Sequence, residues 1–330
     1  MVFTIKTSFR TVWLLLLICT SQVLATPVGL NTRDQNPMFQ AYYLPSIDLP
    51  GIYLKGHQGW QVSHSVYLTS VFQNTSQDNE TLVLDGENYR YDFSIAYQRD
   101  KWRLAAAVPF IFNDDGSFDA AIEDWHDFVG LPQGGRLSRP HNQLEIVYTK
   151  NGETFFSQTQ ATNDIGDIAV SLSYSFANSD KNLSAISFAI ELPTGSEKNI
   201  SGNEAVDVAL WLSRAYQSSK LTRLYGLLGV SLPGQGGQLE RLQESAVWVG
   251  QIGIEHLLYP DWSAIVQLDA HTAFIEDSQL RALGNSVQIQ IGLRVNKITQ
   301  DHDIDLFFAE DIVVGSAPDI TVGVRLHRSY

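Results

Sequence analysis

The feature that most constrains this chain is a strict alternation of apolar and polar side chains over several separate segments. From Asn88 to Gln98, aromatic residues and isoleucine occupy every second position, and polar or small residues occupy the positions between them. The same pattern recurs in segments 167–176, 206–212, 262–268 and 287–295. Because successive side chains of a β-strand point to opposite faces, these segments are predicted to be strands with one apolar face.

Two architectures satisfy such alternation: a soluble sandwich with its apolar faces inside, and a transmembrane barrel with its apolar faces toward lipid. Strand length favours the barrel, because segments of about 10 residues suit a tilted strand that crosses a bilayer. Aromatic residues also lie near the predicted strand ends, where interfacial girdles are found. These aromatic residues are Trp60, Tyr89, Tyr97, Trp102, Tyr148, Tyr174, Phe176, Tyr259 and Trp262.

The spacing of the strands gives a further argument for a membrane barrel. Short connections such as 99–101 and 259–261 alternate with long ones such as 193–204 and 271–285, which is the arrangement of periplasmic turns and outer loops. The chain also ends within an alternating strand whose last residue is Tyr330, similar to the C-terminal signal read by the barrel-assembly machinery. We therefore predict an all-β, transmembrane antiparallel β-barrel, with a secreted sandwich or jelly roll as the alternative.

About 14 strands are predicted within residues 59–330, with 12 as the alternative, and they include two short segments at 143–149 and 153–160. Residues 26–58 contain Asn36-Pro37, Leu44-Pro45 and Leu49-Pro50, so they are predicted to be an irregular lead-in, either periplasmic or within the lumen. No second domain is predicted.

The N-terminus resembles a secretory signal peptide. Lys6 and Arg10 precede a short apolar run, and small residues around Ala25 suit a cleavage site, so residues 1–25 are predicted to be removed on export. A retained anchor is the alternative, and lipidation of Cys19, the single cysteine, is another. These features predict export to a bacterial outer membrane, with outer-membrane lipid as the surrounding partner.

Charge excludes one class of partner. The formal net charge of −14 becomes −16 without Lys6 and Arg10, so a basic footprint for nucleic acid is not expected. No cofactor and no metal site are predicted, because the clustered acids do not follow the spacing of a calcium loop.

The longest predicted connection, residues 113–142, is expected to be partly helical, because apolar residues recur at helical spacing from Ala121 to Val129. Its candidate functional residues are Trp125, His126, Asp127, Gly134, Gly135 and Arg136. Asn36-Pro37, the run from Trp125 to Arg136 and the β-rich half that follows resemble the domain-of-unknown-function 3187 family of proteobacterial outer-membrane proteins. The resemblance implies a location and a barrel fold, and it implies no activity or catalytic residue.

Charged residues on the polar parity of the strands are predicted to line a wet lumen, because charge on the lipid face is costly. The candidates are Arg90, Asp92, Arg103, Glu145, Asp207, Asp269, Arg294, Asp305 and Arg325. An open lumen would make the protein a porin-like channel for small solutes, with loop 113–142 folded into or over the mouth. The alternatives are a non-conducting structural or assembly barrel and a surface hydrolase. No catalytic residue is assigned, and the chain is not predicted to be an enzyme.

Overall fold

The computed structural model describes residues 28–47, 49, 58–130, 133, 135–179, 181–299, 302–313 and 315–330. The predicted signal peptide, Gly134 and part of the 26–58 lead-in lie outside these residues. Within them, no helix is both long and apolar enough to cross a membrane.

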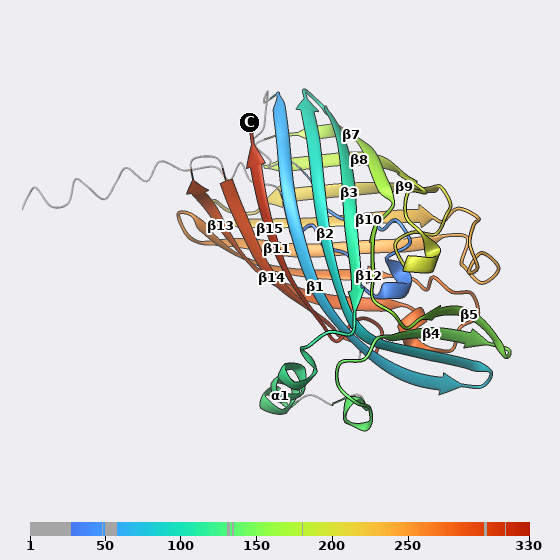
Figure 1. Ribbon diagram of the computed structural model, residues 1–330. Coiled ribbons are helices and arrows are strands. Elements are labelled where there is room, and N and C mark those ends of the chain that lie inside the picture. Colours follow the sequence, from blue (N-terminus) through green and yellow to red (C-terminus); the bar gives the residue numbers. More distant parts are fainter. Residues whose placement is uncertain are drawn as a thin grey trace, which may run out of the picture.

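Twelve antiparallel strands form a closed barrel (Figure 1). They are β1 (Gly59–Gln77), β2 (Glu80–Arg99), β3 (Trp102–Asp114), β7 (Ile168–Asn178), β8 (Asn182–Leu192), β9 (Asp207–Gln217), β10 (Thr222–Leu232), β11 (Val247–Tyr259), β12 (Trp262–His271), β13 (Ser286–Thr299), β14 (His302–Asp311) and β15 (Ile320–Ser329). The remaining elements are β4 (Glu145–Lys150), β5 (Glu153–Gln158), β6 (Thr162–Ile165), the helix α1 (Asp119–Val129) and the 3₁₀ turns η1 (Pro37–Phe39), η2 (Arg136–Ser138), η3 (Glu197–Asn199) and η4 (Arg281–Leu283).

The first and last barrel strands pair with each other, from Gln61 opposite Ser329 to Ser70 opposite Ile320. This pairing removes both sheet edges, and the predicted antiparallel barrel is confirmed. Segments 143–149 and 153–160, which were predicted as barrel strands, form β4 and β5 outside the wall. The hairpin β1–β2 continues past the barrel, and β4 pairs with the projecting part of β2 (80–85). The alternative of 12 therefore describes the barrel.

The outward face of the wall is an apolar belt. On β9 to β11 the exposed side chains include Leu210, Leu212, Leu224, Leu228 and Ile252. Aromatic residues mark the end with the short turns, where Trp60 lies against Tyr97 and Trp102 lies against Tyr174, with ring centroids 4.9 and 4.7 Å apart. This belt and its aromatic rim are typical of a wall that faces lipid.

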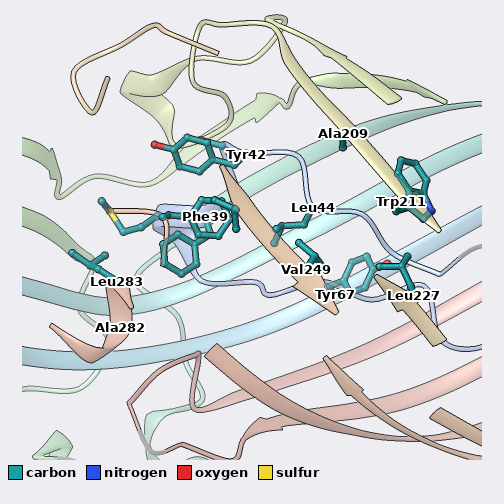
Figure 2. Packing of buried hydrophobic residues seen from close by; sticks show 14 of the residues in the cluster. Phe39, Tyr42, Leu44, Tyr67, Ala209, Trp211, Leu227, Val249, Ala282 and Leu283 are labelled. Atoms are coloured by element: carbon teal, nitrogen blue, oxygen red, sulfur yellow. The ribbon is translucent and has the colours of Figure 1, made fainter. Parts of the chain in front are cut away.

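The interior contains an N-terminal segment that we call the plug, defined as residues 28–47 and Leu49 (Figure 1, blue). The plug rises through the lumen to η1 at the long-loop end and then returns, and the Val28 N–H donates to the Leu49 carbonyl at 2.9 Å where its two arms meet. Figure 2 shows Phe39, Tyr42 and Leu44 of the plug among buried residues of the barrel wall and loops. The lumen is thus partly filled by the chain's own N-terminal segment.

Candidate functional site

The rising arm of the plug is held along one strand of the wall. The Leu30 N–H, the Thr32 hydroxyl and the Asp34 carboxylate bind every second residue of β12 at 3.1, 3.0 and 3.0 Å. Their partners are, in order, Gln267, Asp269 and His271. Because both segments are extended and have the same two-residue repeat, the arm fits the inward face of β12 in a single register.

The base of the plug is held by two arginines. The Gly29 carbonyl accepts hydrogen bonds from Arg294 Nη2 at 2.7 Å and Arg325 Nη2 at 3.0 Å. Gly29 has φ +71°, and a Cβ atom there would lie 2.6 Å from Ile47 Cγ2 and 2.8 Å from Tyr225 Cε2. Both the backbone conformation and the lack of space therefore require glycine at this position.

These two arginines belong to a buried chain of alternating charges whose members come from five strands. Arg223 binds Glu255 at 3.3 Å, Glu255 binds Arg294 at 3.2 Å, and Arg294 Nε binds Asp305 at 2.6 Å. Asp305 also accepts a hydrogen bond from Arg325 Nε at 2.8 Å. Every charge in the chain has an opposite neighbour, which is the condition under which ions persist away from water.

The returning arm contacts β9, β10 and β11. The Tyr43 N–H donates to Asp207 at 3.2 Å, its carbonyl accepts from Ser231 at 2.6 Å, and the Ile47 N–H donates to Gln251 at 2.6 Å. The two arms together fill the part of the lumen bordered by β9 to β15.

The opposite part of the lumen, between the plug and strands β2, β3, β7, β8 and β9, contains a cavity of about 110 Å³. Small side chains line much of its wall: Ala105, Ala107, Ala169, Ser171, Ser173, Ser187 and Ser213. Its lining on β7 extends from Asp167, just before the strand, to Ser173, a separation of about 20 Å along the chain at ~3.3 Å per residue. The cavity is therefore elongated beside the plug.

Charges of both signs face this cavity. Arg90 Nε binds Asp92 at 2.7 Å, and Arg33 of the plug donates to the carbonyls of Phe39, Gln40 and Tyr42. Two further charged residues of the strands, Glu191 and Arg103, also line this cavity.

Asp167 lies at the long-loop end of the cavity, where it accepts hydrogen bonds from the N–H groups of Gly195 at 2.7 Å and Asn203 at 3.3 Å. Burial raises the pKa of Asp167, although these hydrogen bonds oppose the shift. The carboxyl group therefore takes up its proton at a higher pH than an ordinary aspartate.

A second, smaller cavity of about 20 Å³ lies nearer the short-turn end. Ser94 and Arg103 line both cavities, and Arg325, His327 and Arg328 line the second. The two spaces thus follow one side of the plug along the barrel.

The structure places eight of the nine predicted lumen residues on the inside of the wall. Arg90, Asp92 and Arg103 face the cavity. The residues that lie in the filled part are Asp207, Asp269, Arg294, Asp305 and Arg325. Glu145 is a correction, because it belongs to β4 outside the barrel, where its carboxylate pairs with Arg139. Alternation in β4 reflects packing of the projecting sheet and gives no lumen face.

Loop 113–142 is a second correction. It was expected in or over the mouth, but it lies against the outer face of the wall beside β1, where Arg136 packs over the Phe72 ring at 5.2 Å. Arg136 is buried and also binds Asp119 and Asp319. Burial raises the pKa of Asp319, and the positive charge of Arg136 opposes that shift. The plug occupies the lumen in place of the loop.

The remaining loop candidates do not form one site. Asp127 accepts a hydrogen bond from Gln133 at 2.9 Å, Glu123 binds His141 at 3.0 Å, and His126 is buried. Gly135 has φ +90° at the start of η2, where glycine is favoured, and Trp125 is on the outer side of α1. Tyr330, the predicted assembly signal, is exposed beside Arg328, and its N–H donates to the Trp60 carbonyl at 2.8 Å.

Comparison with known proteins gives a fold and a family. The outer membrane channel COG4313 from Pseudomonas putida F1 superposes with a TM-score of 0.54 at 11% identity, over 88% of this chain and 98% of that chain. The NanC porin superposes with a TM-score of 0.46 at 7% identity, over 82% of this chain and 98% of that chain. The CymD monoaromatic hydrocarbon channel superposes with a TM-score of 0.42 at 10% identity, over 92% of this chain and 94% of that chain. The sequence matches no curated protein.

At 11% identity, the superposition on the Pseudomonas putida channel establishes the barrel fold alone. The sequence itself matches the family model described as "Protein of unknown function (DUF3187)" over residues 11–328. The chain therefore belongs to the DUF3187 family.

Proposed function

We propose that the protein is an outer-membrane channel for small polar solutes, and that its route runs beside the plug along the wall of β3, β7 and β8. The observation that carries the proposal is the elongated cavity with its alanine and serine wall. A barrel that served only as a scaffold would be more stable with this space filled, because interiors are otherwise close-packed.

The chemistry of the cavity supports polar solutes. Arg90, Arg103 and Arg33 face it together with Asp92 and Glu191, so solutes would pass between charges of both signs. Arginine and acid on facing walls of a pore orient and select polar solutes. The small volume favours small solutes unless the plug moves.

The alternative is a non-conducting barrel, and it too rests on a specific observation. The charge chain from Arg223 to Arg325 is fully paired, and the plug packs tightly against that part of the wall. If the cavity did not conduct, the barrel would serve in structure or assembly.

Single-channel recording on the folded protein in planar bilayers distinguishes the two. The wild type is expected to give steady conductance steps, and Ser171→Trp is expected to remove most of the current by filling the cavity. Leu172→Trp is the matched control, because the neighbouring side chain is exposed on the outer face.

Absence of steps from protein shown to be folded and inserted would refute the channel. Equal currents in Ser171→Trp and the wild type would show that solutes pass elsewhere, and would refute the proposed route.

A further inference from the structure

Helix α1 lies outside the barrel wall, beside its long-loop end (Figure 1). The N–H groups of Ser117 and Phe118, just before the helix, donate to Glu87 Oε1 of β2 at 2.8 and 2.7 Å. On its other side, the Trp125 ring meets the Phe308 ring of β14 edge-on, with centroids 6.3 Å apart. The helix is therefore attached at two points to the outward face.

These contacts fix the position of α1 along the barrel axis. Phe308 is the last apolar outward residue of β14, and Glu310 follows it on the same face. On β3 the corresponding change is from Phe112, which is exposed, to Asp114. The helix thus lies where the apolar belt ends and polar residues begin, which is the level of the lipid headgroups.

The helix has three distinct sides. Ile122 and His126 are buried against the protein. Trp125 and Phe128 are 40% and 83% exposed, and together with Ala121 they occupy an arc of about 60° at ~100° per residue. Asp127 is on a third, acidic side, about 100° from Phe128, and is exposed.

We propose that the apolar arc of α1 binds the lipid surface of the membrane and anchors loop 113–142 at the outer interface. The Trp125–Phe308 contact joins the apolar arc of α1 to the apolar belt of the wall, so one lipid surface covers both. Tryptophan is favoured at this level because its ring is amphipathic, and a helix with an apolar side and an acidic side lies in the interface plane. The inference requires that the barrel is embedded in the membrane and is independent of conduction.

Site-specific fluorescence tests the proposal. A chain without residues 1–25 has no cysteine, so single cysteines can be introduced and labelled with an environment-sensitive fluorophore. The test position is Phe128→Cys, the matched control on the acidic side is Asp127→Cys, and Leu228→Cys reports the lipid-facing wall. The proteins are refolded into phosphatidylcholine vesicles with or without spin-labelled lipid carrying its quencher near the headgroup.

The label at Phe128 is expected to lose most of its emission to the lipid quencher, and the label at Asp127 is expected to lose little. Quenching at Leu228 establishes that the barrel is inserted. With that control positive, equal and weak quenching at positions 128 and 127 would overturn the proposal. Shielding of position 128 from both the lipid quencher and aqueous iodide would also overturn it, because it would show that protein covers the arc.

Trp125→Ala provides a second readout, since it removes the contact with the belt. In this background the quenching at position 128 is expected to fall while that at position 228 stays unchanged. Unchanged quenching at both positions would exclude Trp125 as the link between the helix and the belt.

Discussion

The two sides of the lumen differ in what their inward residues contact. Along β10 to β15, large and charged side chains pack against the plug, and each ion in the chain from Arg223 to Arg325 is paired. Along β3, β7 and β8, alanine and serine face a cavity. Both sides have the same backbone architecture, so the choice of inward side chain decides which side is filled.

Two glycines allow closer packing on the filled side of the lumen. Phe307 lies against Gly323, where a Cβ would fall 1.9 Å from its ring, and Tyr225 lies against Gly253, where the corresponding distance is 2.3 Å. Large rings therefore fit flat against the wall only because the neighbouring strand has no side chain. On the open side, alanine and serine line much of the wall and leave the space beside them empty.

Removal of the plug should have the largest effect on the difference between the filled and the open side of the lumen. A chain lacking residues 28–49 is expected to conduct several-fold more current than the wild type in single-channel recording, because the filled side would become part of the pore. Circular dichroism and heat-modifiable mobility would establish that the barrel has formed. Unchanged conductance from a folded barrel would contradict the view that the plug fills the path.

The next largest effect is expected in stability. Asp305→Ala leaves Arg294 and Arg325 buried without their shared acid, and should lower the free energy of unfolding by about 3–5 kcal/mol. Asp92→Ala, on the open side, should cost less, about 1–2 kcal/mol, because Asp92 is partly exposed and Arg90 keeps its hydrogen bond to Gln40 Oε1. Urea unfolding in vesicles measures both, and equal losses would remove the distinction between the two sides.

Gly29→Ala tests how tightly the plug is held. The substitution should cost ~1–2 kcal/mol for the left-handed backbone and a further ~1–3 kcal/mol for overlap with Ile47 and Tyr225. Gly152→Ala is the control, because Gly152 has φ +78° in a turn where a Cβ would meet nothing within 4 Å. Similar losses in the two variants would show that the base of the plug yields without cost.

The smallest effect concerns Asp167 on the open side. Because burial raises its pKa, this group should lose its negative charge as pH falls while ordinary aspartates are still ionised. The reversal potential in a salt gradient should therefore shift toward anions. Asp167→Asn should show that shift already at neutral pH and respond less to acid. An identical pH response in the variant would assign the titration to another group.

The barrel could be predicted from sequence because the two-residue repeat is a local property of each strand. The same repeat led to the wrong prediction that β4 and β5 are barrel strands. A strand in the projecting sheet also alternates, and no local signal shows whether a strand belongs to the barrel or to that sheet. The apolar spacing from Ala121 to Val129 predicts helix α1, but the position of α1 outside the wall depends on Glu87 and Phe308, which lie far away in the chain.

The position of the plug also depends on residues far away in the chain, so it could not be predicted from local sequence. Thr32 and Asp34 are two residues apart, and this spacing matches the inward face of a strand, but their partners are on β12. Leu30 and Gln267, which bind each other, are 237 residues apart in sequence. The proline pairs in 26–58 predict irregular backbone, and they carry no information on whether that backbone lies inside or outside the barrel.

The double hydrogen bond to the Gly29 carbonyl has a consequence for assembly. Its donors, Arg294 and Arg325, are on β13 and β15, so the earliest described part of the chain is fixed by residues 265 and 296 positions further along. Such distant contacts form slowly, because most of the chain must be ordered before they can be made. The base of the plug can therefore be fixed only after β13 and β15 are in place, so filling of the lumen is completed late in folding.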